Sequence, residues 1–144
     1  MKVYIASSHK MGAEITKEIF RRIGNDVNIN AFFPEHLGDF TNSIESMSYI
    51  DTICCDKIRE SDVLVAVYPF GYSVSVEIGR FLEYRETNHE KKQFIILDCS
   101  EVGSDGHKLL RTEAMILPHI DYLADSIDDL LAFLYQMVDH VEYC

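Results

Sequence analysis

Several features that would indicate particular classes of protein are scarce in this sequence. It contains only 3 Pro and 7 Gly in 144 residues and is 47% hydrophobic, which excludes a collagen-like, low-complexity or disordered chain. No stretch approaches the roughly 18 apolar residues of a membrane-spanning helix. The segment Met1–Ala6 carries one cation and a short apolar run, so we expect a first strand there and not a signal peptide.

Positive charge is also scarce. The chain has 13 Lys and Arg against 24 Asp and Glu, a formal net charge of -11. Because nucleic acids and anionic membranes are bound through clustered cations, neither is an expected partner. An anionic small substrate is still compatible with this charge, but it would have to be held by backbone amides or a helix terminus.

Recognisable metal, redox and cofactor motifs are missing. The 4 Cys and 6 His form no CxxC, HExxH or similar spacing, which favours reduced thiols in a cytoplasmic protein and no metal site. The GxGxxG, GxxxxGK[ST] and GxSxG motifs are absent as well, so dinucleotide binding, phosphate-loop chemistry and acyl transfer lose their main support. We expect no cofactor.

Apolar strands alternate with helical patterns, which predicts one α/β domain over residues 1–144. The expected strands are Lys2–Ala6, Val27–Phe33, Val63–Val67, Gln93–Leu97 and Ile120–Leu123. The expected helices are Met11–Ile23, Ile44–Glu60, Val74–Tyr84 and Ser126–Val138, with a polar loop or short helix near Lys108–Met115. Continuously apolar strands are typical of a parallel sheet covered on both faces, so we expect a Rossmann-like fold of roughly five parallel strands.

Two of these helices carry informative patterns. The second has an apolar stripe made of Ile44, Met47, Ile50, Cys54 and Ile58. The last begins with Ser126 followed by acidic residues, which is typical of a capped helix N-terminus.

The ligand crevice of such a sheet lies at the carboxyl ends of its strands. Three loops qualify by position: Ser7–Met11, Tyr68–Ser73 and Asp98–Gly106. We therefore expect substrate-binding residues in the first two of these loops and at the helix that follows the second.

The helix after the second loop offers both an anion site and a nucleophile. Gly71, Ser73 and Ser75 lead straight into it, and free N–H groups at such a start can hold an anion. Glu77 is expected in its first turn, where the helix dipole favours the ionised carboxylate that suits a nucleophile. The alternative is that Glu77 merely caps the helix.

The same segment resembles a known family. Asp62–Val67, a loop and Ser73–Arg80 resemble the central motif of the nucleoside 2-deoxyribosyltransferase superfamily, which includes the compact deoxynucleoside 5'-monophosphate N-glycosidases. That motif is an Asp opening an apolar strand, a loop, and a small-residue turn leading into Glu-(Leu/Ile)-Gly, here Glu77–Gly79. The first strand is similar too, with Tyr4 at the position of the family's active-site Tyr. The resemblance implies a flavodoxin-like sheet and homodimers or larger homo-oligomers with shared active sites.

The resemblance also implies a reaction. Glu77 would attack C1' of a 2'-deoxynucleoside or its 5'-monophosphate, and water (hydrolase) or a second base (transferase) would accept the sugar. Tyr4 would orient the carboxylate or contact the sugar. The family's acid, an Asp on the preceding helix, falls at Cys54 in this chain, so Asp51, one turn earlier on the same face, is the favoured substitute and Asp56 the alternative.

The expected substrate-binding residues are Ser7, Phe70, Gly71, Ser73 and Ser75. Two aromatic residues of the loop, Phe70 and Tyr72, either stack on a base or pack at a subunit interface. A second hypothesis is a non-catalytic nucleotide-binding or sensor module of the same fold, which the missing Asp favours.

Overall fold

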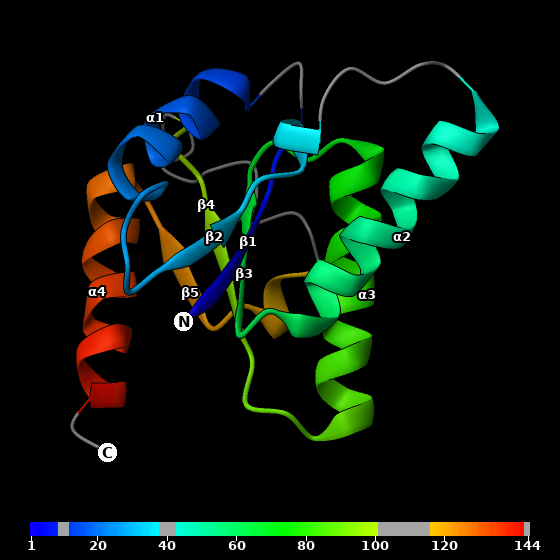
Figure 1. The fold of residues 1–144 in the computed structure, drawn as a ribbon. Helices are drawn as coiled ribbons and strands as arrows, with labels where there is room; N and C mark the ends of the chain where they lie inside the picture. Colours follow the sequence, from blue (N-terminus) through cyan, green and yellow to red (C-terminus); the bar gives the residue numbers. More distant parts are fainter. Residues whose placement is uncertain (9–11, 38–42, 101–115, 143–144) are drawn as a thin grey trace, which may run out of the picture.

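The computed structural model describes residues 1–8, 12–37, 43–100 and 116–142, and within them a five-stranded parallel sheet lies between two layers of helices (Figure 1). The strands are β1 Lys2–Ala6, β2 Asn30–Phe32, β3 Val63–Val67, β4 Gln93–Leu97 and β5 Tyr122–Ala124. The α-helices are α1 Ala13–Ile23, α2 Ile44–Glu60, α3 Tyr72–Asn88 and α4 Ile127–Glu142. Two short 3-10 helices, Pro34–Leu37 and Leu117–His119, complete the described elements. The strand order β2-β1-β3-β4-β5 is the flavodoxin-like order, as expected.

The sheet divides the core into two clusters because successive side chains of a strand point to opposite faces. On β1, Val3 and Ile5 pack with α1 and α4, whereas Tyr4 and Ala6 pack with α2 and α3. All five residues of β3 are buried. Both faces are therefore covered, which explains why the central strands are continuously apolar.

The helix starts are set by short-range contacts. Ser126 Oγ accepts a hydrogen bond from Asp129 N at 3.0 Å, which confirms the predicted cap of α4. At the N-cap of α1, a Cβ added to Gly12 would lie 3.0 Å from Ser7 Cβ, so the chain after β1 passes close to the start of this helix.

Several element boundaries differ from those expected from the sequence. β2 is shorter than Val27–Phe33, because Val27 is 95% exposed and only the second half of the run pairs with β1. β5 lies two residues later than Ile120, and α3 is longer than expected at both ends. The Lys108–Met115 segment lies outside the described residues, as does most of the Asp98–Gly106 loop.

The apolar stripe of α2 is buried only in its second half. Cys54 and Ile58 are buried, but Ile44 and Met47 are 83% and 53% exposed. The reason is position: the first half of α2 reaches outward beyond the sheet, where nothing in the described chain covers it (Figure 1). The apolar stripe predicts which face of α2 is hydrophobic, but it does not predict whether another segment packs against that face.

A buried ammonium group fixes the other end of α2. Lys92 is 7% exposed, and its Nζ donates to the carbonyls of Arg59 at 2.6 Å and Ser61 at 2.7 Å. The same Nζ lies 3.0 Å from the carboxylate of Glu90. Lys92 thus satisfies carbonyls at the helix C-terminus that would otherwise be buried without partners.

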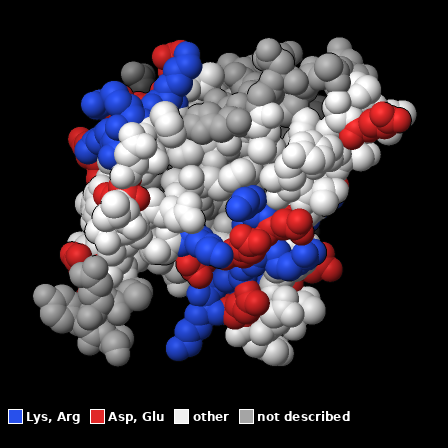
Figure 2. Space-filling view, in the orientation of Figure 1, with Lys and Arg blue, Asp and Glu red and all other residues white. Residues whose placement is uncertain are grey.

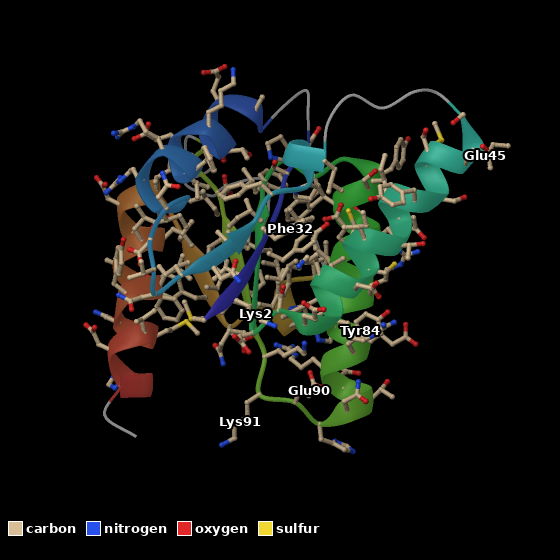
Figure 3. All side chains as sticks on the ribbon, viewed as in Figure 1. Lys2, Phe32, Glu45, Tyr84, Glu90 and Lys91 are labelled. Atoms are coloured by element: carbon tan, nitrogen blue, oxygen red, sulfur yellow. The ribbon has the colours of Figure 1, made fainter. Side chains whose placement is uncertain are left out.

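The Lys92→Met variant should therefore be less stable. It keeps the apolar stem but leaves two carbonyls without their donor, a loss of about 1–3 kcal/mol in the free energy of unfolding. Urea unfolding measures the difference. The matched control is Lys91→Met, because Lys91 is exposed and points away from the body of the protein (Figure 3). Equal stability of the two variants would contradict this role of Lys92.

Candidate active site

Glu77 lies in the second turn of α3, not in the first as expected. The helix begins at Tyr72 with Gly71 as its N-cap, and no side chain forms a hydrogen bond with that cap. Glu77 is therefore not a capping residue. Its Oε2 is buried, and burial raises its pKa to about 7, although the nearby Tyr4 hydroxyl and the charge of Arg80 act in the opposite direction. The helix dipole was expected to favour the ionised carboxylate, but burial raises the pKa toward neutrality, so the protonated and ionised forms coexist near pH 7.

Tyr4 places a hydroxyl beside this carboxyl group. The residue is fully buried at the centre of β1, and its ring packs against Phe32 of β2 at 5.4 Å between centroids (Figure 3). Burial, followed by the neighbouring charge of Glu77 and contact with Cys54, raises the pKa of Tyr4 well above its usual value. The hydroxyl therefore stays protonated and can donate a hydrogen bond.

Two oxygens of this pair are unsatisfied. Although Tyr4 and Glu77 lie close enough to shift each other's pKa, neither Tyr4 Oη nor Glu77 Oε2 forms a hydrogen bond of good geometry within the described residues. Buried polar atoms without partners are costly and uncommon in folded proteins. Such a pair is typical of a site that a ligand completes.

Cys54 is the third member of the group. It lies on the buried side of α2 and is 8% exposed. Burial raises the pKa of its thiol, as do the charges of Glu77 and Asp51, while contact with Tyr4 lowers it. The position at which the family resemblance calls for an acidic residue therefore holds a neutral thiol that contacts Tyr4.

The two candidate acids lie on the exposed side of α2. Asp51 Oδ1 accepts a hydrogen bond from Arg80 Nη1 at 2.7 Å, and its side chain is 58% exposed. Asp56 pairs with Arg59 at 3.2 Å and is similarly exposed. The structure thus brings Tyr4, Glu77 and Cys54 together and directs both aspartates to other partners.

The start of α3 meets the chain that follows β1. A Cβ added to Gly71 would lie 3.4 Å from Ser8 Oγ, so these two segments are neighbours. Ser7 Oγ accepts a hydrogen bond from Thr16 Oγ1 at 2.7 Å and is thereby held at the carboxyl end of β1. Among the described residues, no side chain caps the start of α1 or of α3, so both helix starts keep N–H groups that can hold an anion.

The remaining predicted binding residues differ in their surroundings. Ser73 is exposed near the start of α3, and Ser75 Oγ donates to the Gly71 carbonyl at 3.2 Å. Phe70 is half-buried and packs edge-on against Tyr68 at 5.2 Å. Tyr72 is 97% exposed. Phe70 is therefore already packed within the chain, whereas the surface of Tyr72 is open to a ligand or a second subunit.

Asp62, which opens the motif strand, belongs to the opposite edge of the sheet. Its Oδ2 accepts from Lys2 N at 2.8 Å, and its carbonyl accepts from Gln93 N at 3.0 Å. A hollow of about 540 Å³ lies at that edge and is lined in part by Asp62 and Gln93. The carboxylate thus ties the start of β1 to the start of β3, and the Asp62 carbonyl ties the start of β4 to them, so Asp62 has a structural role. The hollow is separate from the Tyr4–Glu77 pair.

The described ranges contain neither a candidate metal site nor a candidate membrane-spanning helix. Across residues 1–8, 12–37, 43–100 and 116–142, no three His, Cys, Asp or Glu residues are grouped as a metal site would need. The same part of the chain contains no helix that is long and apolar enough to cross a membrane.

Sequence reasoning missed one partner of Glu77. Arg80 follows Glu77 by three residues on α3 and lowers its pKa through its charge. The i,i+3 spacing was a usable signal, because residues three apart share one side of a helix.

The fold and the buried carboxyl–hydroxyl pair define a flavodoxin-like α/β protein with a candidate site at the β1–β3 switch point. No protein-family model and no curated protein sequence matches this chain. Solved structures do match it, each over at least 90% of both chains.

Two of these structures are enzymes by name. The 2-deoxyribosyltransferase of Bacillus psychrosaccharolyticus is 15% identical, with 90% of each chain covered and a TM-score of 0.63. The CMP N-glycosidase of Clostridium botulinum is 14% identical over 95% of this chain and 99% of that chain, with a TM-score of 0.55. A conserved protein of Enterococcus faecalis V583 is 18% identical over 95% and 98%, with a TM-score of 0.63. The resemblance expected from the sequence is confirmed at the level of the fold.

The raised pKa of Glu77 predicts a pH-dependent stability. Between its unfolded pKa near 4.5 and its folded pKa of about 7, the folded protein binds more protons than the unfolded chain, so stability falls as pH rises. From pH 5 to 8, wild type should lose about 2–3 kcal/mol of unfolding free energy relative to Glu77→Gln. Urea unfolding at several pH values measures this difference.

The matched control is Glu83→Gln, because Glu83 is an exposed carboxylate on the same helix. Its stability should follow that of wild type across the whole pH range. A difference between wild type and Glu77→Gln that stays constant with pH would show that Glu77 is not held protonated by burial.

Proposed function

We propose that this protein cleaves or transfers the N-glycosidic bond of a 2'-deoxynucleoside or its 5'-monophosphate, with Glu77 as the nucleophile. The observation that carries the proposal is the Tyr4–Glu77 pair, in which the buried atoms Tyr4 Oη and Glu77 Oε2 form no hydrogen bond within the described residues. The fold, shared with a 2-deoxyribosyltransferase and a CMP N-glycosidase, supports the reaction class.

The first chemical step forms a covalent intermediate. The ionised Glu77 carboxylate attacks C1' of the sugar, the C1'–N bond breaks, and the base leaves with the electron pair and takes up a proton from solvent water. The transition state resembles an oxocarbenium ion, which an adjacent carboxylate stabilises. The Tyr4 hydroxyl, which stays protonated, donates to the carboxylate oxygen that is not attacking and so fixes its direction.

The second step regenerates the carboxylate. Water or a second base attacks C1' of the glycosyl–Glu77 ester, the ester C–O bond breaks, and Glu77 leaves as a carboxylate. Water gives a hydrolase and a second base gives a transferase. In this proposal Ser7, Phe70, Gly71, Ser73 and Ser75 surround the substrate, and the uncapped starts of α1 and α3 accommodate a 5'-phosphate when one is present.

A chromatographic assay for free base tests this function. The protein is incubated with deoxynucleosides and their 5'-monophosphates, each with and without a second base. We expect base release or exchange for at least one substrate, with Glu77→Ala reducing the rate on the order of 10³-fold or more, because the nucleophile is lost. Glu83→Gln, on the exposed side of α3, should retain the wild-type rate.

Two outcomes would contradict the proposal. Near-normal turnover by Glu77→Ala would exclude Glu77 as the nucleophile. No turnover of any substrate, together with protection against heat by the same compounds, would instead favour the binding-module hypothesis, for which Cys54 in place of an acid is the structural reason.

We further propose that the protein forms a homodimer or larger homo-oligomer through α2 and α3. The exposed large apolar residues on these two helices are Ile44, Met47, Tyr49, Tyr72 and Val76. On the face drawn in Figure 2, charged side chains are few over the first half of α2, where Figure 3 labels Glu45, and gather around its second half, where Lys57 pairs with Glu60 and Asp56 with Arg59. An apolar patch rimmed by charge is typical of an interface. Tyr72 and Val76 precede Glu77 on α3, Val76 directly, so a second copy seated here would border the active site.

The Met47→Lys variant should therefore shift the protein toward monomer, because a charge would be buried at the interface. Sedimentation velocity over a tenfold concentration range measures the shift. Val27→Lys is the matched control, since Val27 is 95% exposed but lies outside α2 and α3. A monomeric wild type, or equal sedimentation of the two variants, would contradict the interface.

A further inference from the structure

Arg80 bridges α3 and α2 beside the proposed nucleophile. Its Nη1 donates to Asp51 Oδ1 and to Cys55 Sγ, each at 2.7 Å. The side chain of Arg80 is 35% exposed and that of Asp51 is 58% exposed. The guanidinium is thus directed away from the body of α3 and onto the neighbouring helix.

The local sequence would allow a different pairing. Glu77 and Arg80 stand three apart with the acid first, a spacing that commonly gives an ion pair on a helix. This chain forms that pair elsewhere with the same spacing and order: Glu14–Lys17 at 3.2 Å, Glu18–Arg21 at 2.6 Å and Asp56–Arg59 at 3.2 Å. Within the described residues, Glu77 forms no such ion pair although its partner is present.

Glu77 and Arg80 do not pair because different residues surround each of them. Glu77 is faced by Tyr4 from β1, by Cys54 from α2 and by Arg80 on its own helix. Around Arg80 are Asp51 and Cys55 from α2 and Tyr84 from α3. Asp51 is therefore the anion that competes with Glu77 for this guanidinium.

A direct ion pair with Arg80 would impair Glu77 as a nucleophile. It would draw the attacking oxygen toward the guanidinium and reduce its basicity, and both effects slow attack on an electrophilic carbon. The contact between Arg80 and α2 avoids this while leaving the positive charge close enough to act on Glu77 through space.

We propose that Asp51 is a positioning residue whose carboxylate holds the Arg80 guanidinium on α2, out of a direct ion pair with Glu77, so that the Glu77 carboxylate stays free to attack. The inference rests on the proposed nucleophilic role of Glu77. It gives Asp51 a role different from the general acid expected from the sequence, because Asp51 acts through Arg80 and does not touch the reacting atoms.

The test uses Asp51→Asn, Arg80→Gln and the double variant, with two readouts. The first is the pKa of Glu77 in the free protein, followed by carbon-13 NMR of the side-chain carboxyl and assigned with Glu77→Gln. Asp51→Asn should lower this pKa by about half a pH unit or more, because Arg80 is released toward Glu77. Arg80→Gln should raise it by a similar amount, because the cation is removed.

The second readout is kcat for base release. Asp51→Asn should lose about tenfold, because the nucleophile becomes paired and misdirected. In the double variant the released cation is gone, so kcat should return to within about threefold of Arg80→Gln alone. Glu83→Gln serves as the control for loss of one exposed negative charge.

The outcomes separate the alternatives. If Asp51→Asn loses activity and Arg80→Gln does not restore it, Asp51 is a general acid and the positioning role is overturned. If the pKa of Glu77 is the same in all variants, the positioning role is overturned whatever the activity. If the pKa moves as expected but no protein, wild type included, releases base, the ion-pair competition is supported and the proposed function fails.

Discussion

Burial of the central strands on both faces is the constraint on which the site depends. Because β1 lies between β2 and β3 and helices cover both sides, each of its side chains from Val3 to Ala6 must enter one of two cores. Because successive side chains of β1 point to opposite faces of the sheet, Tyr4 lies in the α2–α3 layer, where its hydroxyl contacts Glu77 and Cys54 instead of water. A slip of one residue in the pairing of β1 with β3 would turn Tyr4 toward α1 and α4 and separate the pair. The chemistry of the site therefore begins with the register of the sheet.

Much of the fold could be predicted from the sequence, because its signals are local and strong. The apolar run Val63–Val67 is a strand with the predicted bounds, and Ser126 caps the last helix as expected. Boundaries that depend on neighbours were less predictable. The start of α3 at Tyr72 follows from the turn at Gly71, and the exposure of Ile44 follows from how far α2 extends beyond the sheet. Neither is encoded in periodicity alone.

The candidate site, like the fold, was predictable where its signals are local and not where they depend on tertiary packing. A carboxylate on a helix after a central strand pointed to Glu77, and the resemblance pointed to Tyr4, because both lie in short segments with a recognisable pattern. The direction of the pKa shift at Glu77 was not predictable, since its main cause is burial, and the depth of burial depends on tertiary packing. The partner of Arg80 was not predictable either, because helical spacing permits Glu77 and only the placement of α2 selects Asp51.

The clamp at Lys92 has a mechanical consequence for α2. The helix is tethered at its last turn, where Nζ holds the carbonyls of Arg59 and Ser61, while its opening turns project without support from the described chain. Cys54 and Ile58 anchor the second half of α2 in the core, and Asp51 joins the middle of the helix to Arg80 of α3. A load placed on the exposed apolar end would therefore reach the Asp51–Arg80 contact before it reached the buried turns of the helix.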